Sequence, residues 1–144
     1  MITTPVSECL YCQNNERLDS LMIKICDLEV SQLFLFKEQT YHGRCNVVYK
    51  DHAKDIQDLD EDQLNAFMKD VASVGKVIAE IYNPSKLNYG TYGDVVTHLH
   101  IHVVPKYEDG YGFGTTFEMN PEKTYLSDTG YTEMIDGIKK GLNR

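Results

Sequence analysis

Three histidines alternate with apolar residues in the run His-Leu-His-Ile-His at residues 98–102, and no other feature constrains the fold as strongly. Alternate side chains of a β-strand share a face, so we expect the imidazoles in a row about 6–7 Å apart, with Leu99, Ile101 and Val103 facing the core. A solvated edge strand is the plain alternative, but Lys, Glu or Thr would serve there without clustering groups that titrate near neutrality. The run therefore predicts a strand with catalytic or metal-binding histidines on one face.

Two kinds of chemistry fit such a row of imidazoles. A metal ion needs ligand nitrogens about 2 Å away, which neighbouring same-face positions of a strand supply in pairs, together with a further ligand nearby. A nucleophilic site needs one imidazole to attack phosphorus while an acceptor holds its other nitrogen, and a second cationic group to stabilise charge on the phosphoryl oxygens. The histidine pattern alone does not decide between them.

The pattern of apolar residues predicts an α+β fold with a mainly antiparallel sheet. Apolar residues at steps of three and four from Leu64 to Ile81 predict one long helix, with Asp60 as its N-cap and Asn83-Pro84 at its end. The same spacing predicts a last helix between Tyr131 and Leu142. Five short β-prone segments predict strands at residues 22–28, 32–36, 44–49, 86–89 and 98–105.

The composition narrows the choice of partners. The chain of 144 residues, 1–144, has the usual size of one domain, and 22 acidic against 14 basic residues give a net charge of −8. That charge repels long polyanions, so we expect no nucleic acid partner, whereas a small phosphorylated ligand remains compatible. We find no signal peptide pattern and no run near the ~18 apolar residues of a membrane helix, so we expect a cytoplasmic protein without a membrane partner.

Four cysteines are present, and without a secretion signal we expect them to be reduced. Cys26 and Cys45 lie in apolar segments and are interpreted as packing residues. Cys9 and Cys12 form a C-x-x-C pair, and two thiolates at this spacing can bind one tetrahedral zinc ion. A buried pair without a metal is the alternative. A thioredoxin-like redox site is disfavoured because the pair does not lie between a strand and a helix of a βαβ unit.

The segment at residues 88–105 resembles the histidine triad (HIT) superfamily, whose signature is His-φ-His-φ-His-φ-φ, with φ apolar. Residues 43–52 resemble the family's Gly-His-φ-φ-φ-φ-Pro-Lys-x-His segment, and the likeness extends over residues 9–107. The resemblance implies a HIT-like α+β fold, a homodimer, and a reaction in which the middle histidine forms a nucleotidyl intermediate that water hydrolyses. His100 would be this nucleophile, and His102 would stabilise or protonate the leaving group.

The resemblance also implies where a nucleotide would bind. Main-chain N–H groups near Gly93 and Asp94 would hold the α-phosphate, and Asn88 would make a polar contact. Apolar walls for the sugar and base would come from the first sheet segment, with Ile23, Phe34 and Phe36 as candidates. The two phenylalanines fit equally well as core residues of one strand face.

Three positions depart from the family pattern. Arg44 stands where a histidine is common, and it keeps a cation near the phosphate but cannot act as an acid or base. Asp94 stands where a glutamine is usual, so it would either repel a phosphate or orient a histidine or a water. Val95 replaces a hydroxyl residue. His42 precedes the glycine, but counting back from His52 places Arg44 at the family position, so we interpret His42 as an exposed residue.

A zinc site is implied by the same resemblance. In one branch of the superfamily, and in the related galactose-1-phosphate uridylyltransferases, zinc is bound by an N-terminal cysteine pair, the histidine after Lys-x and the first triad histidine. The matching residues here are Cys9, Cys12, His52 and His98. Four protein ligands leave no open position, so the zinc would be structural. It would fasten an N-terminal segment of about residues 1–20 to the catalytic core of about residues 21–107. A tail and a helix at about residues 108–144 follow this core, and all three parts form one domain.

The leading hypothesis for function is hydrolysis of a nucleoside 5′-phosphoryl bond, in a phosphoramidate, a dinucleoside polyphosphate or an adenylylated conjugate, with an AMP-like nucleotide preferred. A nucleotidyltransferase would share the covalent step and differ in the acceptor, but the chain is short for an enzyme that also holds a sugar phosphate. A nucleotide-binding regulatory protein with incidental turnover is the third hypothesis, since the acidic surface and a dimer-forming fold also suit partner binding.

Overall fold

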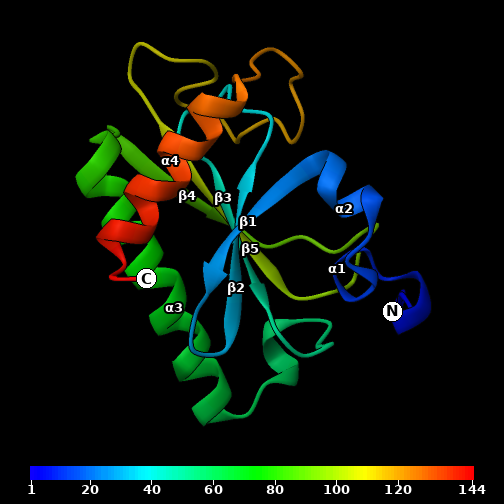
Figure 1. The fold of residues 1–144 in the computed structure, drawn as a ribbon. Coiled ribbons are helices and arrows are strands. Elements are labelled where there is room, and N and C mark those ends of the chain that lie inside the picture. The colour runs from blue at the N-terminus through cyan, green and yellow to red at the C-terminus, as the bar shows by residue number, and fades with distance from the viewer.

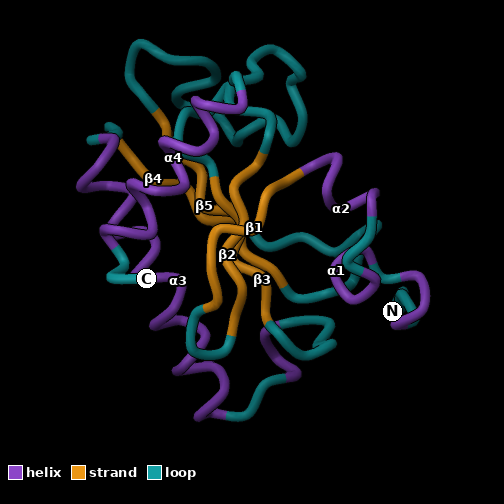
Figure 2. The backbone as a smooth tube through the Cα atoms, viewed as in Figure 1, coloured by secondary structure: helices purple, strands orange, loops and turns teal.

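A five-stranded antiparallel sheet forms the centre of the computed structural model, which describes residues 1–144 (Figure 1; Figure 2). The strand order is β1-β2-β3-β5-β4, and every neighbouring pair is antiparallel. The strands are β1 (Met22–Asp27), β2 (Ser31–Phe36), β3 (Cys45–Tyr49), β4 (Lys86–Gly90) and β5 (His100–Lys106). The predicted α+β class and antiparallel sheet are confirmed.

Helices lie on both sides of this sheet, as Figure 1 shows. The two longer helices, α3 and α4, lie on one side, and the short helices α1 and α2 lie with the N-terminus on the other. Their bounds are α1 (Leu10–Gln13), α2 (Glu16–Leu21), α3 (Glu61–Tyr82) and α4 (Asp128–Gly141). None of the helices combines the length and the apolar character that a membrane crossing requires.

Alternation along the strands separates two apolar clusters. The larger cluster joins one face of the sheet to α3 and α4, and its members on β5 and just before it include Leu99, Ile101 and Val103, as predicted. The smaller cluster lies on the opposite face, where Phe34 and Phe36 of β2 pack with Leu10 and Leu18 of the N-terminal helices. Because side chains alternate, His100 and His102 of β5 fall on this second face.

The long helix begins and ends where its capping residues predict. Asp60 accepts a hydrogen bond from the backbone of Gln63 at 2.9 Å, and the Gln63 side chain accepts one from the Asp60 backbone at 3.0 Å. At the other end Asn83 adopts a left-handed conformation, with φ 46°, immediately before Pro84. The predicted helix is therefore confirmed, and the reciprocal caps explain its limits.

Strand β5 begins later than the sequence predicts. The expected strand started at residue 98, but ladder pairing with β3 stops at Val48 and His100, so His98 lies outside the strand. There the ring of His98 donates to the carbonyl oxygen of Tyr49 at 2.6 Å and turns toward the N-terminal segment. The prediction of three imidazoles in one strand row is wrong for the first of them. The short helices α1 and α2 were also not predicted.

The carboxylate of Asp70 fastens the turn between β1 and β2 to α3. It is buried, and it accepts hydrogen bonds from the backbones of Glu29 (3.2 Å) and Val30 (3.0 Å) and from the Ser31 hydroxyl (2.6 Å). Removing it would leave these donors without partners inside the protein.

We expect Asp70→Ala to lower the free energy of unfolding by about 1.5–3 kcal/mol, the range for hydrogen bonds to a charged group, in a urea titration. Lys76→Ala, on the exposed side of the same helix, is the control and should stay within about 0.5 kcal/mol of the parent protein. Equal losses in the two variants would contradict the role given to Asp70.

Candidate functional site

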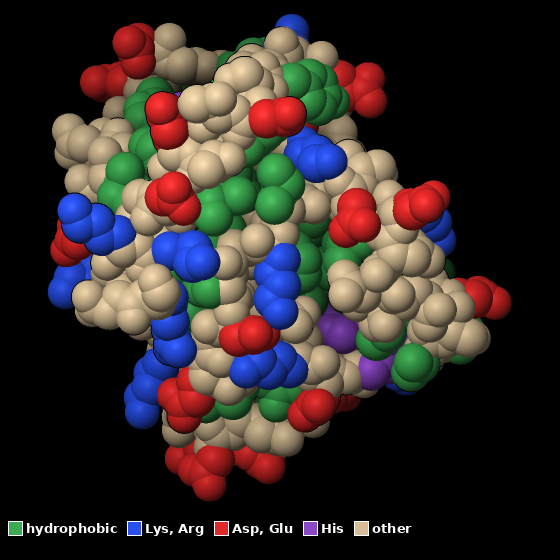
Figure 3. Space-filling model, in the orientation of Figure 1, with side chains coloured by type: hydrophobic (Ala, Val, Ile, Leu, Met, Phe, Trp, Pro, Cys, Tyr) green, Lys and Arg blue, Asp and Glu red, His purple; other side chains and the backbone are tan.

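His100 and His102 lie next to each other on β5, with ring centroids 5.1 Å apart. Both line a cavity of about 590 Å³. Its other walls come from α1, α2, β1, β2, the loop after β4 and the tail, which is the irregular segment between β5 and α4. On the side of the molecule where Figure 1 places α1 and α2, Figure 3 shows histidine side chains reaching the surface beside hydrophobic ones. A largely apolar cavity with a few polar groups is the usual form of a small-molecule site.

The backbone fixes the tautomer of His100. Its Nδ1 atom lies 2.6 Å from the carbonyl oxygen of His98. Because a carbonyl can only accept, Nδ1 carries the proton and donates it, and Nε2 keeps a free lone pair. Burial lowers the pKa of His100 below its ordinary value, so the ring is neutral at neutral pH. A neutral imidazole with a free Nε2 is the form that can attack an electrophile.

His102 is held in the opposite tautomer. Its Nδ1 atom lies 3.4 Å from Nη2 of Arg44, which can only donate, so the ring proton sits on Nε2. The ring stacks on Phe36 with centroids 5.3 Å apart. Burial above all, and then the neighbouring His100 and Arg44, lower the pKa of His102 to about 3. His102 is therefore a neutral N–H donor at neutral pH.

Arg44 is enclosed behind the cavity. Burial lowers its pKa to about 10, so it remains a cation at neutral pH. Its guanidinium carbon lies 3.9 Å from the ring centroid of Phe36, and the group donates to the carbonyl oxygen of Met119. Arg44 does not line the cavity, so it lies behind His102 and acts on the cavity through its charge and not by direct contact.

The remaining residues predicted to bind a nucleotide fall into two groups. Phe36, Gly93 and Asp94 line the same cavity as the two histidines. Asn88 instead lines a separate cavity of about 290 Å³. Ile23 packs against the main core on the other face of the sheet, so it is not a wall of the cavity.

Two predictions about single residues outside the cavity can be checked directly. His42 is exposed, as predicted, and its ring packs edge-on against Tyr82 with centroids 5.1 Å apart. Phe34 belongs to the smaller apolar cluster, as the core interpretation proposed, and does not line the cavity.

Several cavity residues were not predicted. Tyr11, between the two cysteines of the pair, places its ring 5.2 Å from that of His100. Arg17 and Ser20 come from α2, and Met119 and Asn120 come from the tail. Of these residues, only Tyr11 could have been predicted from the sequence, because a residue inside a C-x-x-C turn lies wherever the two cysteines are held. The tail has no periodic pattern that would place it.

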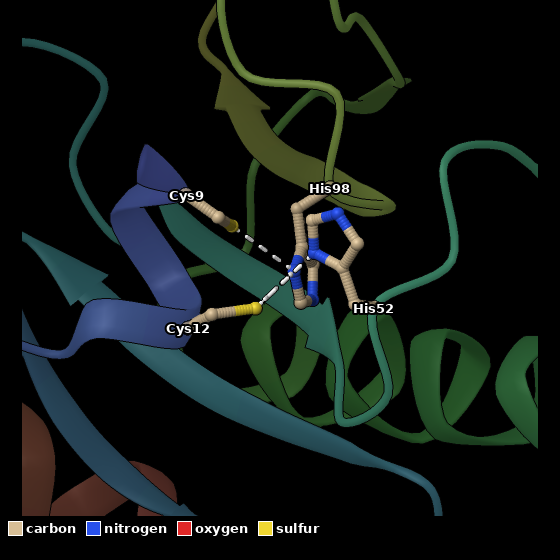
Figure 4. Close-up of side chains that lie close together, drawn as sticks. All are labelled: Cys9, Cys12, His52 and His98. Carbon is tan, nitrogen blue, oxygen red and sulfur yellow. Dashed lines mark hydrogen bonds between the residues drawn. The ribbon is translucent and has the colours of Figure 1, made fainter. Parts of the chain in front are cut away.

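Four potential metal ligands lie close together, as Figure 4 shows. The donor atoms of Cys9, Cys12, His52 and His98 all lie within 4.8 Å of one another. Nδ1 of His98 lies 3.4 Å from each sulfur, and Nδ1 of His52 lies 3.2 Å from the Cys12 sulfur. Bond lengths of about 2.0–2.3 Å to a tetrahedral ion place its ligand atoms roughly 3.3–3.8 Å apart, so the three nitrogen–sulfur separations are close to those around one ion.

The outer nitrogens of both histidines are already used. Nε2 of His52 lies 2.9 Å from the carbonyl oxygen of Thr4, and Nε2 of His98 lies 2.6 Å from that of Tyr49. Donation to these carbonyls leaves the lone pair on Nδ1, which is the atom facing the sulfurs. These four side chains could therefore bind a metal ion, and a Cys2His2 set of this kind suits zinc.

Comparison of the sequence with known proteins identifies relatives that share the HIT domain. The pattern of the HIT domain family matches residues 21–109. A HIT-like protein of Mycoplasma genitalium is 33% identical over 113 residues, which cover 75% of this chain and 79% of that protein. The adenosine 5′-monophosphoramidase of Schizosaccharomyces pombe is 28% identical over 119 residues, 80% of this chain and 89% of that enzyme.

Solved structures show the same fold. A histidine triad protein from Bradyrhizobium japonicum has a TM-score of 0.81 at 24% identity, over 89% of this chain and 96% of that one. A zinc-bound histidine triad family protein from Mycobacterium smegmatis has a TM-score of 0.67 at 19% identity, over 96% of both chains. Because the HIT domain pattern spans most of the chain and includes the histidine run, this protein belongs to the HIT domain family.

Proposed function

We propose that this protein hydrolyses a nucleoside 5′-phosphoryl bond and releases a nucleoside monophosphate, with AMP-like substrates preferred. The observation that carries the proposal is the free Nε2 of His100. The hydrogen bond between Nδ1 and the His98 carbonyl leaves this nitrogen with a lone pair, and His100 lines a cavity of about 590 Å³. The related phosphoramidase of S. pombe supports the same class of reaction. Candidate substrates are phosphoramidates, dinucleoside polyphosphates and adenylylated conjugates.

The proposed reaction has two steps. Nε2 of His100 attacks the α-phosphorus, the bond to the leaving group breaks, and its electron pair departs with that group. Nε2–H of His102 donates a hydrogen bond to the leaving group. Main-chain N–H groups near Gly93 and Asp94 donate hydrogen bonds to the phosphoryl oxygens. Water then attacks phosphorus and the N–P bond breaks. This step returns the lone pair to His100 and releases the proton of water.

A nucleotidyltransferase and a nucleotide-binding regulatory protein remain the alternatives. The transferase would pass the nucleotidyl group from His100 to an acceptor other than water. The regulatory protein would keep its biological activity in a complementation assay when His100 is replaced by alanine, whereas an enzyme would lose it. The homodimer and the cytoplasmic location stay predictions.

We expect His100 to become covalently nucleotidylated during turnover. Mass spectrometry after rapid quenching without acid should find the adduct on the peptide that contains His100. His100→Ala should lose the adduct and several orders of magnitude in rate, because a nucleophile has no substitute in this step. His42→Ala, at the exposed histidine, should keep both. Turnover by His100→Ala within about tenfold of the parent enzyme would rule out the mechanism.

We also propose that Cys9, Cys12, His52 and His98 bind one structural zinc ion. The separations of the four donor atoms, the two backbone carbonyls behind the histidines and the zinc-bound relative from M. smegmatis support this. When bound, the ion would hold the cysteine pair against the segment that leads into β5. Catalysis would stay with His100 and His102.

Protein purified without added zinc or a metal-binding tag should contain close to one equivalent of zinc by metal analysis. The double variant Cys9→Ser with Cys12→Ser should lose it and melt at a lower temperature, because the free energy of binding at a closed site adds to that of folding. Cys26→Ser, outside the cluster, should retain the metal. A metal-free protein that zinc neither binds nor stabilises would defeat the proposal.

A further inference from the structure

We propose that the Arg44–His102 pair makes this site selective for substrates whose leaving group departs as an oxyanion, such as a phosphate or a carboxylate, over substrates that release an amine. The inference rests on the proposed nucleotidyl transfer to His100 and narrows its substrate class. It does not follow from the family pattern, in which a histidine commonly stands at the position of Arg44.

The first step of the argument is the position of the proton on His102. Nη2 of Arg44 lies 3.4 Å from Nδ1 of His102, and a guanidinium has no acceptor atom. Nδ1 must therefore accept. The single ring proton then lies on Nε2, and His102 itself lines the cavity. The stacked ring of Phe36, at 5.3 Å, holds the imidazole in this orientation.

The second step is the charge of Arg44, which no direct ion pair neutralises, although the charge of the buried Glu38 raises its pKa from farther away. No carboxylate oxygen lies within 4 Å of its nitrogens, since the one ion pair of the chain joins Lys24 and Asp27. Its partners besides His102 are the carbonyl oxygen and the sulfur of Met119, which carry no net charge. An imidazolium at His102 would put a second positive charge beside this buried cation. Burial, His100 and Arg44 together lower the pKa of His102 to about 3.

The third step is what a neutral His102 can do for a leaving group. When a P–O bond breaks, its electron pair stays on the departing oxygen, which leaves as an anion and needs no proton. Nε2–H of His102 can donate a hydrogen bond to that oxygen, and the charge of Arg44 stabilises it from behind. When a P–N bond breaks, the nitrogen must gain a proton to leave as an amine. A neutral imidazole is too weak an acid to supply it.

A further cation at the cavity favours the same class of leaving group. Arg17 of α2 lines the wall, is exposed, and has no ion pair. Asp94 is the one carboxylate among the lining residues. At this cavity, one acidic lining residue therefore faces two cations, Arg17 in the wall and Arg44 behind it. The protein as a whole, by contrast, has a net charge of −8. Two cations beside one cavity suit an anionic leaving group.

The test compares two adenosine substrates. Diadenosine tetraphosphate releases an oxyanion, whereas adenosine 5′-phosphoramidate releases ammonia, whose nitrogen must gain a proton to leave just as an amine must. The parent protein should have the higher kcat/KM on diadenosine tetraphosphate. In Arg44→Met the ratio of the two kcat/KM values should fall about tenfold or more, because a charge-assisted contribution to one leaving group is lost and His102 can accept a proton for the other. A ratio cancels any loss of folded protein, which affects both substrates equally.

Two further variants sharpen this comparison. Arg44→His, which installs the residue common in the family, should lower the ratio in the same direction. Arg144→Met, at the exposed C-terminal arginine, should leave it unchanged. A parent protein that prefers the phosphoramidate, or a ratio that neither Arg44 variant changes, would overturn the inference while leaving the proposed function intact. Failure to cleave either substrate, with no adduct on His100, would overturn the proposed function itself.

A spectroscopic measurement on the unmodified protein tests the inference independently of activity. The titratable or charged neighbours of the His102 ring are His100 on the same strand, Arg44 just before β3 and Tyr92 in the loop after β4. Nitrogen-15 NMR should show the His102 ring neutral, with its proton on Nε2, from pH 8 down to pH 5. An imidazolium at His102 at pH 6, or a proton on Nδ1, would overturn the proposal.

Discussion

The hydrogen bond between Nδ1 of His100 and the carbonyl oxygen of His98 is the contact on which the rest of the site depends. It leaves Nε2 of His100 free, and it can form because His98 lies just before β5 and not within its ladder. The side chain of the same residue faces Cys9 and Cys12 through Nδ1 and is anchored to Tyr49 through Nε2. His98 thus joins the potential metal site to His100, the proposed nucleophile, because its ring belongs to the first and its backbone carbonyl accepts a hydrogen bond from the second.

Local rules predicted the parts of the fold that depend on neighbours in sequence. Alternation placed Leu99 and Ile101 in the core, and the box of Asp60 with Gln63 fixed the start of α3. The family motif named all four members of the cysteine and histidine cluster, which the structure brings together. What the pattern missed depends on contacts between distant segments: the end of the β3–β5 ladder, and the place of Asn88 in a separate cavity.

Two buried cations explain how the irregular segment between β5 and α4 is held in place as a wall of the cavity. Lys106 is buried and donates to the carbonyl oxygens of Gly112 and Thr115. Arg44 donates to that of Met119 further along. Hydrogen bonds from buried charged groups are stronger than neutral ones, so two such donors can hold a segment that forms no helix or strand. No local sequence pattern reports these contacts, which is why the tail contribution to the site could not be predicted.

Tyr11 gives the potential metal site a way to affect the cavity without taking part in chemistry. The residue lies between Cys9 and Cys12 in sequence, its ring is 5.2 Å from that of His100, and its hydroxyl accepts a hydrogen bond from Asn46 at 2.7 Å. An ion that fixed the two cysteines would also fix this ring against His100. The cluster is thus coupled to His100 by two routes, the His98 backbone and the Tyr11 ring. Loss of such an ion should therefore loosen the positioning of His100 without removing either histidine proposed to act in catalysis.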